Sequence, residues 1–149
     1  PHARAALAHV MPRNAIPARA PENGIDLDPL KAYVAALSDR ALPVAKMTWK
    51  TRHSASIRAN LSPKQVVSVQ ISAHPGWLAT VNGRSVPVVA DAIGQVVIEP
   101  GCSGECSIEL DYDGGAEMRV ARRISWAAAL LSVVWMIVGR RYWPLATSH

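Results

Sequence analysis

The spacing of apolar residues first follows a helical period in the segment DPLKAYVAALSDRALP, residues 28–43. Apolar residues three or four positions apart share one face of a helix, and here they are Leu30, Tyr33, Val34 and Leu37. Asp28 is placed to cap this helix, Pro29 suits its first position, and Pro43 ends it. We therefore predict a short amphipathic helix and a connection over residues 28–46.

From Ser54 the period changes to two, which is typical of a sheet with one buried and one solvated face. In VVSVQISA, apolar residues at 67, 69, 71 and 73 alternate with polar residues at 68, 70 and 72. Similar short runs are SASIRAN, WLATV, RSVPVV, QVVIE and SIELDY. Six short strands joined by turns predict a small antiparallel β-sandwich over residues 47–120, and so a mainly β fold.

The turns between these strands have specific chemistry in AHPGWLATVNGRSVPV, residues 73–88. Asn82 and Gly83 are the favoured pair for a type I′ hairpin, because both central residues need a positive φ. Pro75 and Gly76 form a second turn signal before Trp77. Pro87 cannot donate a ladder hydrogen bond, so we expect its strand at a sheet edge or a bulge.

The longest apolar segment is ISWAAALLSVVWMIVG, residues 124–139. As a helix it rises roughly 24 Å, against roughly 30 Å for the hydrocarbon core of a bilayer. Arginine side chains at its ends can snorkel, and Trp126, Tyr142 and Trp143 suit the membrane interface. The flanking arginines are Arg122, Arg123, Arg140 and Arg141. We predict one C-terminal transmembrane helix over residues 121–143; a buried core helix is the alternative.

The two ends of the chain lack a steady period. Residues 1–27 hold four prolines and scattered arginines, and we expect a linker or a disordered segment there. Residues 144–149 form a short tail. Because the chain begins with proline rather than methionine, we expect a fragment or a processed product.

The net charge of +5 raises the question of nucleic-acid binding. Its distribution argues against that class, because residues 47–117 carry five basic and seven acidic side chains. After residue 117 there are five arginines and no acidic residue, and they surround the apolar segment. The basic excess therefore belongs to the predicted membrane helix, and we expect no nucleic-acid partner.

The chain has two cysteines, in GCSGEC at residues 101–106. A zinc site would need further ligands, and the nearest histidine in the sequence is His74. A Cys102–Cys106 disulfide would indicate an oxidising compartment; two idle thiols are the alternative.

Motifs for catalysis are missing from the sequence: there is no glycine-rich phosphate loop, no HExxH and no GxSxG. His74 could act in a hydrolase only with a partner such as Asp91, and a hydrogen-bonded turn residue is the simpler interpretation. Asp111 and Asp113 flank Tyr112, where a calcium site competes with a solvated strand end. We therefore predict no catalytic residue, no metal site and no cofactor.

Trp77 and Arg84 are the candidate glycan contacts. The flat face of a tryptophan packs well on the apolar face of a sugar, but core packing at the base of the hairpin explains Trp77 as well. A carbohydrate-binding or adhesion module tethered to the membrane is therefore the alternative function.

The order of these motifs resembles the C-terminal end of large bacterial multi-pass membrane proteins, the YfhO-like and related GT-C-type glycosyltransferases. The resemblance covers residues 28–143. The matching positions are Pro75, Gly76, Trp77, Val81, Asn82, Gly83, Arg84, Pro87, Val88, Pro100, Gly101, Leu110 and Tyr112. The cysteine pair is not part of that pattern.

The resemblance implies a parent enzyme that transfers sugar from a polyprenyl-phosphate carrier, with its catalytic acids near N-terminal membrane helices that this chain lacks. This chain would then be a non-catalytic accessory region in cell-envelope glycan synthesis or modification. We expect it in the bacterial inner (cytoplasmic) membrane with the sandwich on the extracytoplasmic side. The implied partners are membrane lipid, the remaining transmembrane helices of the parent protein, and a polyprenyl-linked sugar or glycan.

Overall fold

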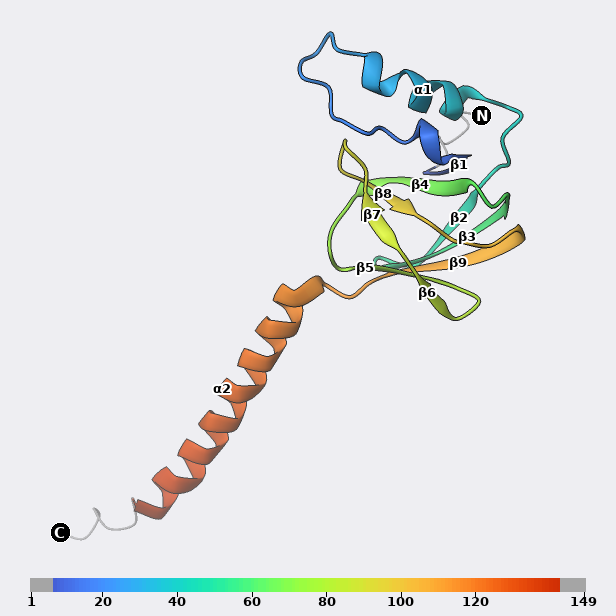
Figure 1. The fold of residues 1–149 in the computed structure, drawn as a ribbon. Helices are drawn as coiled ribbons and strands as arrows, with labels where there is room; N and C mark the ends of the chain where they lie inside the picture. Colours follow the sequence, from blue (N-terminus) through green and yellow to red (C-terminus); the bar gives the residue numbers. More distant parts are fainter. Residues whose placement is uncertain (1–6, 143–149) are drawn as a thin grey trace, which may run out of the picture. The chain divides into compact units, whose positions relative to one another are not determined.

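The computed structural model describes residues 7–142, which belong to two units. The first unit extends to Asp113 and the second begins at Gly114. The first unit contains the strands and a short helix, and the second contains one long helix (Figure 1). The predicted mainly β fold, with a short helix before the strands and an apolar helix after them, is confirmed.

The first unit is built from two antiparallel sheets. The four-stranded sheet has the order β1 (Ala8–Pro12), β4 (Gln65–Ser72), β8 (Gln95–Ile98) and β7 (Val88–Ala90). The five-stranded sheet has the order β2 (Lys46–Thr51), β3 (Ser54–Leu61), β9 (Gly104–Tyr112), β5 (Trp77–Val81) and β6 (Arg84–Val86). The alternation found in the sequence sets which side chains of each strand point between the sheets.

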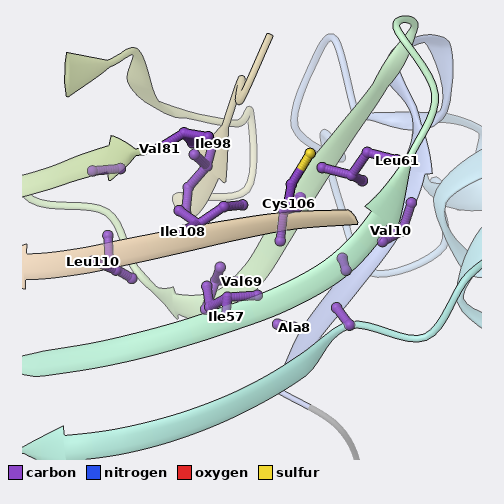
Figure 2. Packing of buried hydrophobic residues seen from close by; sticks show 14 of the residues in the cluster. Ala8, Val10, Ile57, Leu61, Val69, Val81, Ile98, Cys106, Ile108 and Leu110 are labelled. Atoms are coloured by element: carbon purple, nitrogen blue, oxygen red, sulfur yellow. The ribbon is translucent and has the colours of Figure 1, made fainter. Parts of the chain in front are cut away.

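The core lies between the two sheets, as Figure 2 shows. Ile57, Ile108 and Leu110 come from the five-stranded sheet, and each is fully buried. The four-stranded sheet contributes Val67, Val69, Val96 and Ile98, which are also fully buried. Burying such a side chain contributes about 1.5–3 kcal/mol, so this interface between the sheets is the main source of stability in the unit.

A third layer covers the outer face of the four-stranded sheet. It consists of η1 (Arg13–Ala15), η2 (Asp28–Leu30) and α1 (Lys31–Ser38), which lies over β1 and β4 in Figure 1. Tyr33 is buried there among Met11, Val66 and Val97. Its hydroxyl donates to Gln95 Oε1 at 2.7 Å and lies 3.3 Å from Ser68 Oγ, so a buried polar group is satisfied across the layers.

The predicted helix differs from the observed one in two respects. Val34 is 54% exposed, and Ala36 packs inward with Leu37, because the helix has only eight residues and turns its Tyr33 face to the sheet. Asp28 makes no side-chain capping bond and instead pairs with Lys31 Nζ at 2.6 Å.

The expectation of a linker or disorder over residues 1–27 is wrong for residues 8–15, which form β1 and η1, whereas residues 16–27 form a connection with no helix or strand. Ala8–Pro12 forms β1 and pairs with β4, from Ala8 opposite Val69 to Pro12 opposite Gln65. Ala8 and Val10 enter the main core, while Met11 faces Tyr33. Five residues give too short a pattern to identify in sequence, and Pro12 is tolerated because it ends an edge strand.

Pro87 lies where the chain leaves one sheet for the other. It separates β6, an edge of the five-stranded sheet, from β7, an edge of the four-stranded sheet. Its carbonyl accepts a hydrogen bond from the amide of Glu99 at 3.1 Å. The single predicted strand RSVPVV is therefore two short edge strands, and the proline is at an edge as expected.

The second unit contains α2 (Gly115–Tyr142). Its segment Val120–Val138 has a mean hydropathy of 1.4 and no buried residue. Nineteen helical residues rise about 28 Å, close to the thickness of a hydrocarbon core. Among the residues described, this is the one helix long and apolar enough to cross a membrane; Trp143 and the tail, 144–149, lie outside them.

Candidate functional site

The side chains of interest meet at one end of the sandwich. Trp77, the first residue of β5, pairs with Tyr112, the last residue of β9. Asp111, next to Tyr112, pairs with Ser54 at the start of β3, and this brings the β2–β3 turn to the same end. The sheet register therefore gathers residues that are far apart in sequence. We call this set the aromatic end: Trp49, His53, His74, Trp77 and Tyr112.

Tyr112 is the centre of the aromatic end. Its ring centroid lies 5.0 Å from that of Trp77, 5.4 Å from His74 and 6.0 Å from His53. Trp49 extends the cluster, at 6.4 Å from Trp77. Tilted and edge-on aromatic pairs contribute about 0.5–1.5 kcal/mol each beyond the area they bury, so the rings stabilise one another.

Hydrogen bonds fix the loop that carries His74. Its Nδ1 accepts from the Gly76 amide at 3.1 Å, and the Tyr112 hydroxyl lies 3.1 Å from the same nitrogen. Trp77 Nε1 donates to the Ser72 carbonyl at 3.3 Å, and the Asp113 amide donates to the Gly76 carbonyl at 2.9 Å. His74 is therefore hydrogen-bonded within the turn through its Nδ1.

Asp91, the acid considered as a partner for His74, has a structural role in the β7–β8 loop. Its Oδ1 accepts from the amides of Ile93 at 3.0 Å and Gln95 at 2.8 Å. Its Oδ2 is buried and has no hydrogen-bond partner. Within residues 7–142 no group of three or more His, Cys, Asp or Glu side chains could hold a metal ion.

The two tryptophans of the aromatic end differ in their exposure to solvent. Trp77 is half-buried and packs against the main core, whereas Trp49 is 41% exposed. Leu78, which follows Trp77 on β5, is 49% exposed. An apolar surface therefore remains open to solvent at this end of the sandwich.

Arg84 lies away from Trp77, the other candidate glycan contact. It begins β6 and pairs with Val81, the last residue of β5, while Trp77 is the first residue of that strand. Four residues of strand separate the two positions by about 13 Å. Asn82 and Gly83, with φ of 51° and 77°, form the hairpin between β5 and β6.

The cysteines lie at the other end of β9. Cys102 and Cys106 are joined by a disulfide, and Cys106 is buried in the core beside Leu61 (Figure 2). A groove of about 680 Å³ is lined near this end by Arg13, Lys64 and Glu99 among others. Two of these charges, Arg13 and Glu99, pair with each other at 2.7 Å.

The arginines predicted to flank a membrane all belong to α2. Arg122 and Arg123 are exposed near its beginning, and Arg140 and Arg141 lie in its last turn.

Comparison with known proteins identifies no relative: no family model, no curated protein and no solved structure matches the chain.

Proposed function

We propose that this chain is a non-catalytic, membrane-anchored β-sandwich, the extracytoplasmic part and final helix of a larger bacterial membrane protein. The observation that carries the proposal is the direct connection from β9 to α2. The sandwich ends at Tyr112, and an exposed apolar helix begins at Gly115.

The surface of α2 supports a lipid environment. Its exposed apolar side chains include Trp126, Leu131, Trp135 and Ile137, each more than 60% exposed. Together they form an apolar surface that water-soluble monomers rarely present. A helix satisfies its own backbone hydrogen bonds, so it can lie in hydrocarbon without a partner.

A non-catalytic role fits the hydrogen bonds of His74, the one histidine considered for catalysis, whose Nδ1 is engaged within its turn. The resemblance of its motifs assigns the chain to a glycosyltransferase parent. On that ground, the parent acts on a polyprenyl-linked sugar, and its other transmembrane helices are the partners of α2.

The disulfide supports the extracytoplasmic side, because disulfides persist in oxidising compartments. With the sandwich outside and α2 across the membrane, the C-terminal tail is in the cytoplasm.

The test is to express the chain in bacteria, extract the membranes with carbonate, and label intact cells with a membrane-impermeant thiol reagent. We expect resistance to extraction, and labelling of Cys102, the more exposed cysteine, only after reduction. The matched control is Ser148→Cys in a Cys102→Ala, Cys106→Ala background, which should be labelled only after lysis. A chain that carbonate releases, with both positions labelled in intact cells, would contradict the proposal.

A carbohydrate-binding module is the second candidate, favoured by the exposure of Trp49. It predicts a saccharide-dependent change in tryptophan fluorescence that Trp49→Phe abolishes. No change across a broad panel of glycans would argue strongly against it.

A further inference from the structure

We propose that the aromatic end of the sandwich is a lipid-contact surface, which rests on the headgroup layer of the bilayer that α2 crosses. The proposal depends on the membrane span proposed above and adds a second, peripheral attachment to it. Three independent observations support it: the distribution of aromatic residues, the length of the connection, and the exposed side chains.

Aromatic residues are unevenly distributed in the first unit. Of Tyr33, Trp49, Trp77 and Tyr112, all but Tyr33 lie at the end of the sandwich from which α2 departs. Tyr33 is buried under α1. The opposite end carries polar or charged side chains such as Asn60, Lys64 and Glu105. Tryptophan and tyrosine favour the membrane–water interface, where the ring is in an apolar layer and its polar atom is hydrated.

The connection to α2 is too short to lift this end far from the bilayer. From Tyr112 to Gly115 the chain spans at most about 11 Å, and from Gly115 to Val120 the helix rises about 8 Å. Whatever the angle at the junction, Tyr112 therefore stays within about 20 Å of the apolar span. The opposite end of β9, at Gly104, is about 26 Å further along the strand.

The exposed side chains at this end suit a phospholipid headgroup. A hollow of about 420 Å³ is lined by Trp49, Lys50, Thr51 and Arg52. Arg52 is exposed beside the half-exposed ring of Trp49, which places a guanidinium next to an apolar surface. Arginine binds phosphate oxygens in a bidentate manner, and the indole can enter the layer beneath them.

The test measures how strongly nitroxide on lipid headgroups quenches tryptophan fluorescence in two variants of the full chain that differ in the position of one tryptophan. The reporter variant keeps Trp49 and Trp77 and replaces Trp126, Trp135 and Trp143 by Phe. The matched control has the same replacements, Trp49→Phe, and Lys64→Trp at the opposite end. Both retain Trp77 against the core, and circular dichroism checks that both are folded. Each is reconstituted in phosphatidylcholine vesicles with and without headgroup nitroxide, then floated on a density gradient.

We expect quenching of the reporter to exceed that of the control by about twofold or more, because the exposed ring of Trp49 lies at the proposed lipid contact, position 64 is at the opposite end, and Trp77 contributes equally to both. Equal quenching of two floated chains, or none in either, would overturn the lipid contact and leave the membrane span standing. A chain that does not float would overturn both. Absence of quenching together with a glycan-induced shift of Trp49 fluorescence would assign the aromatic end to sugar binding instead.

Discussion

At the scale of single residues, Tyr33 links two layers of the sandwich unit through its hydroxyl. We predict that Tyr33→Phe lowers the free energy of unfolding by about 1–2 kcal/mol, because Ser68 Oγ and Gln95 Oε1 lose a buried partner. Chemical denaturation of the chain in detergent measures this. Tyr112→Phe is the matched control: its hydroxyl is at a half-exposed position where water can replace it, so we expect about 0.5 kcal/mol or less.

Gly83 needs a left-handed backbone conformation, since its φ is 77°. No atom would contact an added Cβ, so a substitution there tests the backbone conformation alone. Gly83→Ala is therefore expected to cost about 1–2 kcal/mol from backbone conformation alone. Gly24→Ala has the same open space without a positive φ, and its cost should be negligible. Equal stability of the two variants in thermal unfolding would show that the hairpin does not require the left-handed conformation.

The sequence allowed the Asn82–Gly83 turn to be predicted, because turn chemistry is local. The aromatic end was missed for the opposite reason. Trp49, Trp77 and Tyr112 come from three strands, and their contact depends on the register of β5 and β9 and of β2 and β3. A signal was present, since both Trp77 and Tyr112 lie at strand ends next to turns, but a single sequence does not show which strands pair.

At the scale of elements, a substitution in β1 tests whether this strand, which lies before residue 27, is part of the cooperative fold. Met11→Ala is expected to lower the free energy of unfolding by about 2–5 kcal/mol, because the Met11 side chain on β1 is fully buried under the α1 layer. Val44→Ala, at a side chain that is 82% exposed, should change it by about 0.5 kcal/mol or less. If Met11→Ala were as mild as Val44→Ala in urea denaturation, β1 would not be part of the cooperative unit.

The strands that were predicted and those that were missed differ in physical character. β9 alternates cleanly because one of its sides faces the core and the other faces solvent. β4 alternates in sequence but is buried on both sides, since Val67 and Val69 face the core while Val66 and Ser68 lie under the α1 layer. β2 is exposed along almost its whole length, with Lys46, Thr48 and Lys50 on an edge, so its residues follow no burial pattern. β1 owes its structure to pairing with β4 rather than to a pattern of its own.

At the scale of the whole molecule, the core of the sandwich is formed by residues between Ala8 and Leu110. We therefore predict that a fragment ending at Asp113 folds in aqueous buffer without α2. Circular dichroism should show a cooperative thermal transition at a temperature close to that of the sandwich in the full chain in detergent. A fragment that shows no cooperative transition would mean that α2 or the membrane is needed for folding.

The position of β9 also has a mechanical consequence. It is an inner strand, paired with β3 at eight register positions and with β5 at five, and it continues into α2. Ladder hydrogen bonds run across the strands, so a pull along β9 loads many of them in shear at once instead of opening them one by one from an edge. Force passed from the membrane would therefore enter the sandwich through a strand that resists extraction, and the anchor would hold until the sheet itself ruptures.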